Sequence, residues 1–108
     1  MKRAVYIIAL LFISLYACTD QVTQSRKLYK SYFNMVLKDP SSLVIYKEEY
    51  VEWEKNKFEW TLDIGAKNEY GGMVRKTYHI KTDGGRRYIE VMGPGEVNYE
   101  LVYIEPGY

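Results

Sequence analysis

The longest uncharged apolar segment of the sequence lies close to the N-terminus. Lys2 and Arg3 precede this segment, residues 4–17 form it, and polar residues resume at Thr19. A helix that spans a membrane needs about 20 apolar residues, so this segment is too short to be one. A basic start followed by a short apolar run is instead the pattern of a signal peptide, and we expect residues 1–17 to be removed during export.

A helical pattern follows the signal segment. Four apolar residues recur at i, i+3, i+4 and i+7, which places them on one helix face: Tyr29, Tyr32, Phe33 and Val36. This spacing predicts a helix from near Val22 or Ser25 to Leu37. The helix should end there because Pro40 disfavours the helical conformation at the residue before it.

Beyond Pro40 the pattern changes from helical spacing to alternation. The clearest example is a run in which four apolar residues alternate with polar ones: Phe58, Trp60, Leu62 and Ile64. Such alternation predicts a half-buried antiparallel strand whose apolar residues face the core. Residues 43–53, 73–82 and 86–92 are expected to form further strands, because they are rich in β-branched and aromatic residues or alternate in the same way.

Turn sequences separate these segments. Lys55-Asn56-Lys57 is expected to close one hairpin and Asp83-Gly84-Gly85 another, because tight hairpin turns need residues that accept a positive φ. Residues 65–72 carry three glycines, interrupt the alternation and are expected to form a loop. Alternation resumes near the C-terminus, which predicts either a final strand or a docked tail: Val97, Tyr99, Leu101 and Tyr103.

One helix followed by a meander of antiparallel strands predicts an α+β fold. We expect an N-terminal helix packed on a meander of about four strands, with a fifth strand if the C-terminal segment pairs with the sheet. A chain of 108 residues has room for one domain. We assign residues 25–108 to this domain and residues 18–24 to a tether in front of it.

The last four residues of the signal region, Leu15-Tyr16-Ala17-Cys18, resemble a bacterial lipobox. The resemblance implies that the Cys18 thiol receives a diacylglycerol, that the chain is cut before Cys18, and that the new amine is acylated. Two or more acyl chains anchor a protein stably to a bilayer. Cys18 is the only cysteine, so the exported product forms no internal disulfide. Asp in the position of Thr19 commonly marks inner-membrane retention, so Thr19 implies the outer membrane if the source is Gram-negative.

Two further segments resemble motifs of a family of small bacterial exported proteins. They contain Lys38-Asp39-Pro40-Ser41-Ser42 and Ala66-Lys67-Asn68-Glu69-Tyr70-Gly71-Gly72. The corresponding family motifs are a Lys-Asp-Pro-x-Ser helix end and an Ala-Lys-Asn-x-Tyr-Gly-Gly loop. The resemblance implies an envelope setting and an α+β layout, and it implies no activity. Many members have a cysteine near the second motif, where this chain has none.

Both segments also have a structural interpretation. The polar side chains of residues 39–42 can hydrogen-bond to the backbone, which would end the helix and start the first strand. In the second segment the glycines permit a positive φ, and Asn68 tolerates one. The alternative is that this segment contacts a ligand or partner, since loops often carry binding residues. In that case we expect Lys67, Asn68 and Tyr70 to make the contact.

The charges of the chain are nearly balanced. There are 15 Lys+Arg and 14 Asp+Glu residues, and Lys2 and Arg3 leave with the signal segment, so the mature chain is close to neutral. Nucleic-acid-binding proteins need a net basic surface, so this class is not expected. His79 is the only histidine, and Cys18 is expected to carry lipid. We therefore expect no metal site, and the sequence contains no nucleotide or cofactor motif.

These observations favour a non-enzymatic lipoprotein, anchored to a membrane of the cell envelope, that binds a protein or glycan partner. The 12 tyrosines suit either a half-buried sheet face or a binding surface. Two alternatives stay open. The first is an immunity or inhibitor lipoprotein that blocks a toxin or hydrolase in the periplasm. The second is a small hydrolase that uses a carboxylate pair, for which Glu59 and Asp63 are the candidates.

Overall fold

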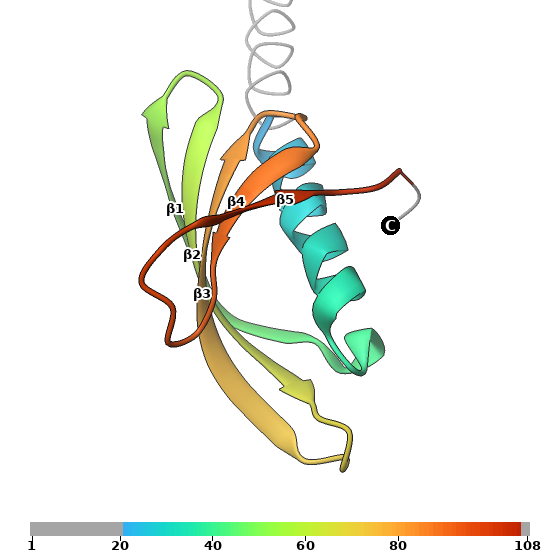
Figure 1. The fold of residues 1–108 in the computed structure, drawn as a ribbon. Coiled ribbons are helices and arrows are strands. Elements are labelled where there is room, and N and C mark those ends of the chain that lie inside the picture. The colour runs from blue at the N-terminus through green and yellow to red at the C-terminus, as the bar shows by residue number, and fades with distance from the viewer. Residues whose placement is uncertain (1–20, 107–108) are drawn as a thin grey trace, which may run out of the picture.

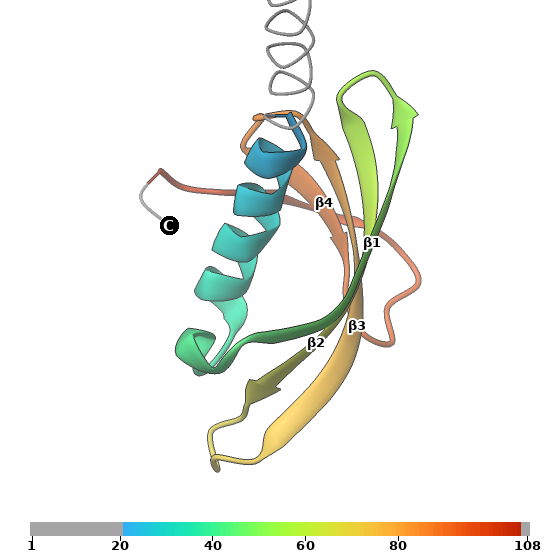
Figure 2. The same ribbon diagram turned by 180° about the vertical axis from the view of Figure 1, so that it is seen from behind.

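The fold is an α+β sandwich of one helix and one sheet. The structure is a computed structural model that describes residues 21–106. A helix occupies residues 21–36 and packs on one face of a five-stranded antiparallel sheet with strand order β1-β2-β3-β4-β5. The sheet curves around the helix, as the two opposite views show (Figure 1 and Figure 2). The expected α+β class is confirmed, and the C-terminal segment does form a fifth strand.

The elements follow one another with short connections. After the helix come a 3-10 turn and five strands: η1 Pro40–Ser42, β1 Val44–Glu54, β2 Lys57–Lys67, β3 Met73–Asp83, β4 Tyr88–Met92 and β5 Glu100–Tyr103. The hairpin turns expected near Asn56 and at Asp83-Gly84-Gly85 are present, and Asn56 and Gly84 have positive φ. Residues 21–24, expected to belong to the tether, are already helical. Val22 packs against the core, which gives this turn of helix a reason to form.

The segment expected to be a signal peptide and the lipidation residue Cys18 lie outside the described residues. No helix within residues 21–106 has the length and apolar character that crossing a membrane requires.

The core lies between the helix and β2. The four alternating residues of β2 are all buried, as the sequence predicts, and Tyr29 and Phe33 of the helix face them. The Tyr29 and Trp60 rings meet edge to face with centroids 5.1 Å apart, and Phe33 meets Tyr78 of β3 at 5.0 Å. Edge-to-face contacts of this kind add to the stabilisation from burial alone. The indole N–H of Trp60 donates to Thr82 Oγ1 (2.9 Å), so the largest core side chain leaves no donor unpaired.

The alternating apolar residues predicted for the final strand face mostly solvent. Leu101 and Tyr103 are exposed, and so is Val97 in the preceding loop, whereas Val102 is half-buried against the core and Ile104 is fully buried. The pairing of β5 with β4 decides which residues of β5 face the core, because Val102 lies opposite Ile89. Both faces of this strand carry apolar residues, so only the neighbouring strand decides which set is buried.

The loop expected over residues 65–72 is shorter in the structure, where it starts only after residue 67. Residues 65–67 belong to β2, where Gly65 pairs with Val44 on one side and Arg75 on the other. The reason is the ring of Tyr46: its Cε2 atom lies 2.7 Å from where a Cβ of Gly65 would stand. Gly65 therefore leaves room for a cross-strand aromatic side chain and does not mark a loop.

A charged contact joins the helix to the edge strand. Arg26 Nε donates to Glu48 Oε1 (2.7 Å), and the Tyr29 hydroxyl donates to the same oxygen (2.6 Å). Desolvation by burial alone would raise the pKa of the Glu48 carboxyl. The hydrogen bonds from Arg26 and Tyr29, together with the charge of Arg26, outweigh it, and the net effect is a lowered pKa. The charged form of Glu48 therefore stabilises the docked helix.

We expect Glu48→Gln to lower the free energy of unfolding at pH 7 by about 1 kcal/mol, because one charge-assisted contact is lost from a partly exposed site. The pKa of Glu48 is lower in the folded chain than its ordinary value of 4.5. Its contribution is therefore present above that value and is lost as the pH falls through the folded pKa. Urea titrations over a series of pH values should show the largest difference between wild type and variant at pH 7 and a shrinking difference as the pH falls below 4.5.

Glu52→Gln is the matched control, because Glu52 lies on the same strand and faces the same side as Glu48. Glu52 forms no hydrogen bond or ion pair with another residue of the described chain. An equal loss of stability in both variants would contradict the role assigned to Glu48.

Candidate functional site

The turn between β2 and β3 is held by one side chain. Asn68 Oδ1 accepts hydrogen bonds from the backbone N–H of Tyr70 (2.9 Å) and of Gly72 (3.0 Å). The Asn68 N–H also donates to the Gly72 carbonyl (2.9 Å), and Gly71 has a φ of 81° that few other residues would accept. Asn68 is therefore the residue that shapes this turn. Tyr70 stands at its tip with 88% of its surface exposed.

Residues 38–42 at the helix end and residues 66–72 of the β2–β3 turn meet at this place in the fold. The backbone N–H of Lys67 donates to Ser42 Oγ (2.8 Å), and that hydroxyl in turn donates to the Asp39 carbonyl (2.6 Å). The helix end thus follows the expected side-chain-to-backbone bonding. The same serine also fixes the start of the β2–β3 turn against η1.

A pocket of about 170 Å³ opens beside this junction. The end of the helix, the end of β2 and the start of β3 enclose it on the helix-facing side of the sheet. Its floor is apolar: Val36, Leu37, Ile64, Ala66, Val74 and Tyr78. Its remaining lining residues are polar: Lys38, Lys67, Asn68 and Lys76. We call this the lysine pocket.

The charged residues that line the lysine pocket are all lysines. Its three lysines come from three different segments, and none of them forms an ion pair within residues 21–106. No lining residue of the described chain is acidic. Burial, and secondly the charge of Glu96, raise the pKa of Tyr78, so its hydroxyl stays protonated and can act as a donor. The site can therefore hold a negative charge over an apolar floor.

The structure brings together two of the three residues that the sequence indicated. Lys67 and Asn68 line the lysine pocket, while Tyr70 is exposed at the turn tip and does not line it. Sequence reasoning missed Lys38, although it lies in the first motif. It also missed Lys76, which shares the alternation of Val74 and Tyr78 and so faces the helix side. The sequence did contain a signal for Lys76, because this lysine stands at a strand position where the alternation would place an apolar residue.

The carboxylate pair considered for hydrolysis lies on the opposite face of the sheet. The Asp63 carboxylate accepts hydrogen bonds from Arg75 Nε and Nη2, the shorter of them 2.7 Å long. These hydrogen bonds lower the pKa of the Asp63 carboxyl. Glu59 Oε1 accepts a hydrogen bond from the Tyr99 hydroxyl (3.1 Å). His79 is also on this outer face, with Nδ1 3.4 Å from Thr61 Oγ1. Within residues 21–106 no group of three or more side chains is arranged to hold a metal ion.

We expect Asn68→Ala to open the β2–β3 turn, because the N–H groups of Tyr70 and Gly72 lose their shared acceptor, at a cost of about 1 kcal/mol. Hydrogen exchange measures the effect directly, and these two amides should exchange faster. Asn68→Asp keeps an acceptor oxygen and should preserve most of their protection. Unchanged exchange in Asn68→Ala would contradict the structural role of this side chain.

Comparisons with known proteins leave the lysine pocket to be interpreted from its own residues. No protein-family model, no curated protein and no solved structure matches the chain. The lysine pocket combines a positive lining with an apolar floor, and it lies at the far end of the helix from residue 21.

Proposed function

We propose that this protein is a lipid-anchored component of a bacterial envelope that binds a negatively charged group of a protein or glycan partner in the lysine pocket, without chemical turnover. The observation that carries the proposal is the set of three exposed lysines from three segments around one apolar floor. Each lysine lacks an ion-pair partner among the described residues, although acidic side chains are abundant elsewhere in the chain.

The chemistry of the lysine pocket favours a carboxylate or phosphate. Ammonium groups are compact charges with several donors, so they recognise anionic oxygens. Apolar walls lower the local dielectric constant, which strengthens the attraction between opposite charges. The apolar floor would accept the uncharged part of the same ligand. Concave sites with a few polar groups over an apolar surface are typical of specific binding sites.

The position of the lysine pocket suits an anchored protein. The helix of residues 21–36 is about 24 Å long, and the pocket lies at its C-terminal end. Cys18, the proposed lipidation residue, precedes the helical residues by three positions. An anchor at that end would hold the pocket away from the bilayer, where it could reach a partner in the envelope space.

The anchor is tested on the mature protein expressed in a bacterium. Intact-mass measurement should find a chain that starts at Cys18 and carries acyl mass, because lipidation and cleavage follow the Leu15-Tyr16-Ala17-Cys18 pattern. Cys18→Ser should abolish the acyl mass and release the protein from the membrane fraction. A wild-type product that still starts at Met1, or that has no acyl mass, would overturn the proposed anchoring.

The lysine pocket is tested by charge removal. In the triple variant Lys38→Gln, Lys67→Gln, Lys76→Gln, the affinity for isolated cell-wall material that carries carboxylates and phosphates should fall at least about tenfold. Binding by the wild type should also weaken as salt is added, because counterions screen exposed charges. Co-sedimentation at several salt concentrations measures both effects.

A second triple variant controls for net charge. Lys27→Gln, Lys30→Gln and Lys55→Gln remove the same charge from exposed positions that do not line the lysine pocket. This variant should bind within about twofold of the wild type. Equal loss in the two triple variants would mean that net charge, and not the pocket, governs binding, and the proposal would fail.

A further inference from the structure

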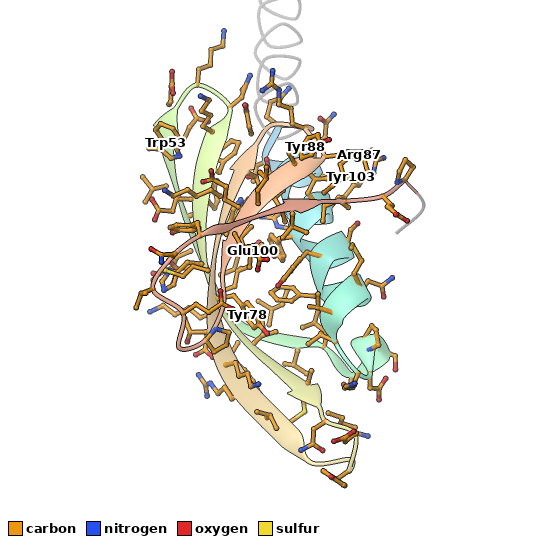
Figure 3. All side chains as sticks on the ribbon, viewed as in Figure 1. Trp53, Tyr78, Arg87, Tyr88, Glu100 and Tyr103 are labelled. Atoms are coloured by element: carbon orange, nitrogen blue, oxygen red, sulfur yellow. The ribbon has the colours of Figure 1, made fainter. Side chains whose placement is uncertain are left out.

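The outer face of the sheet carries a second candidate site, built from exposed aromatic side chains. Trp53 is 54% exposed and Tyr88 is 59% exposed, and Leu101 and Tyr103 beside Tyr88 are also open to solvent. Figure 3 shows Trp53 at the β1–β2 hairpin, with Tyr88 and Tyr103 together on the far side of β3. Clustered exposed apolar residues on a small protein commonly mark an interaction site.

Trp53, Tyr88 and Leu101 line a groove of about 290 Å³ across the strands. Trp53 on β1 stands at one end and Tyr88 on β4 at the other, with β2 and β3 between them. Three inter-strand spacings separate the two strands, which is about 14 Å. The Tyr88 ring is supported by Tyr103, whose centroid is 4.9 Å away. The distance between the two walls exceeds the length of one sugar ring or one amino-acid side chain.

The floor of the groove is charged but has no net charge. Lys57 and Lys81 lie there beside Asp83 and Glu90. Pairing of β2 with β3 places Lys57 opposite Asp83, and pairing of β3 with β4 places Lys81 opposite Glu90. Donors and acceptors therefore lie together between the two aromatic walls, and the Lys57 ammonium covers one side of the Trp53 ring (5.3 Å to its centroid) while it pairs with Glu54 (3.2 Å). Such a floor offers hydrogen bonds to a neutral ligand and gives no net attraction to an ion.

This combination discriminates between ligand classes. The buried centre of a protein–protein interface is depleted of Lys, Asp and Glu, whereas this groove has four such residues between its aromatic walls. Grooves that bind single-stranded nucleic acid pair their aromatic residues with a net positive charge, which is lacking here. A neutral sugar chain has apolar C–H faces that pack on aromatic rings, and hydroxyl groups that need both donors and acceptors.

We propose that the groove between Trp53 and Tyr88 binds a neutral oligosaccharide, with one sugar ring on each aromatic wall and hydroxyl groups over the charged floor. The lysine pocket lies on the other side of the sheet and selects for negative charge. The two sites are thus independent, and neither the anchor nor the lysine pocket is required for this second one.

The two tryptophans make the proposal directly measurable. Trp60 is 0% exposed, so a ligand-induced change in tryptophan emission reports Trp53. The probes are tetrasaccharides of N-acetylglucosamine, of β-linked glucose and of α-linked glucose, titrated into the full chain. At least one should shift the emission to shorter wavelength, saturate, and protect the indole from acrylamide quenching. If none of the three saturates, the proposal is overturned.

Variants locate the binding. Tyr88→Ala should weaken the saturating sugar at least about tenfold, because it removes one stacking surface but keeps the fluorophore. Tyr70→Ala removes a tyrosine that is still more exposed (88% against 59% for Tyr88) at the far end of the sheet, and it should leave the affinity unchanged. Trp53→Ala, followed by calorimetry, provides a second test if Tyr88→Ala fails to fold. Equal weakening by Tyr70→Ala and Tyr88→Ala would place the sugar outside the groove and refute the assignment.

The lysine-pocket triple variant separates this proposal from the previous one. It should retain full affinity for the tetrasaccharide while it loses affinity for anionic cell-wall material. Loss of sugar binding in that variant would show that the two ligands share one site, and the groove would no longer be assigned.

Discussion

The contact of Tyr29 with Trp60 holds this fold together. Trp60 is the largest fully buried side chain and lies on β2, which pairs with both β1 and β3. Tyr29 covers its ring from the helix, and Tyr50 of β1 packs against it with centroids 4.8 Å apart. One indole thus joins the helix to two strands. A small domain has little stability to spare, so the arrangement of both candidate sites depends on this packing.

The helix defines the two faces of the sheet, and each face has its own chemistry. On the helix side, the core ends at the last turn of the helix, where apolar residues reach the surface and become the floor of the lysine pocket. On the outer side, no helix formed by residues 21–106 covers the sheet, and charged side chains alternate along β2 and β3. The C-terminal loop crosses part of this face, where Tyr99 packs under Lys81 (4.2 Å) and donates to Glu59. The groove lies beside that loop, toward the β1–β2 hairpin.

Both candidate sites are suited to recognition. The two carboxylates that the sequence suggested for hydrolysis both have hydrogen-bond partners. Asp63 accepts from Arg75, and Glu59 accepts from the Tyr99 hydroxyl. Arg75 also stacks on Tyr46, which fits over Gly65. This chain of contacts stabilises the long β1–β2–β3 part of the sheet. It gives Asp63 a structural partner and explains why a glycine stands within a strand.

The sequence by itself determined the order and type of the elements, because period-two alternation and turn residues are local signals. It also indicated the segment that contains Lys67 and Asn68. Only the tertiary structure decided that Gly65 lies in a strand, because the ring that needs the space comes from Tyr46 on another strand. It also decided that Lys38, Lys67 and Lys76 share one pocket, and that Trp53 and Tyr88 face each other across a groove. Strand pairing makes these contacts between residues on different segments, and the pattern within one segment does not show which side chains of the other segments will lie beside it.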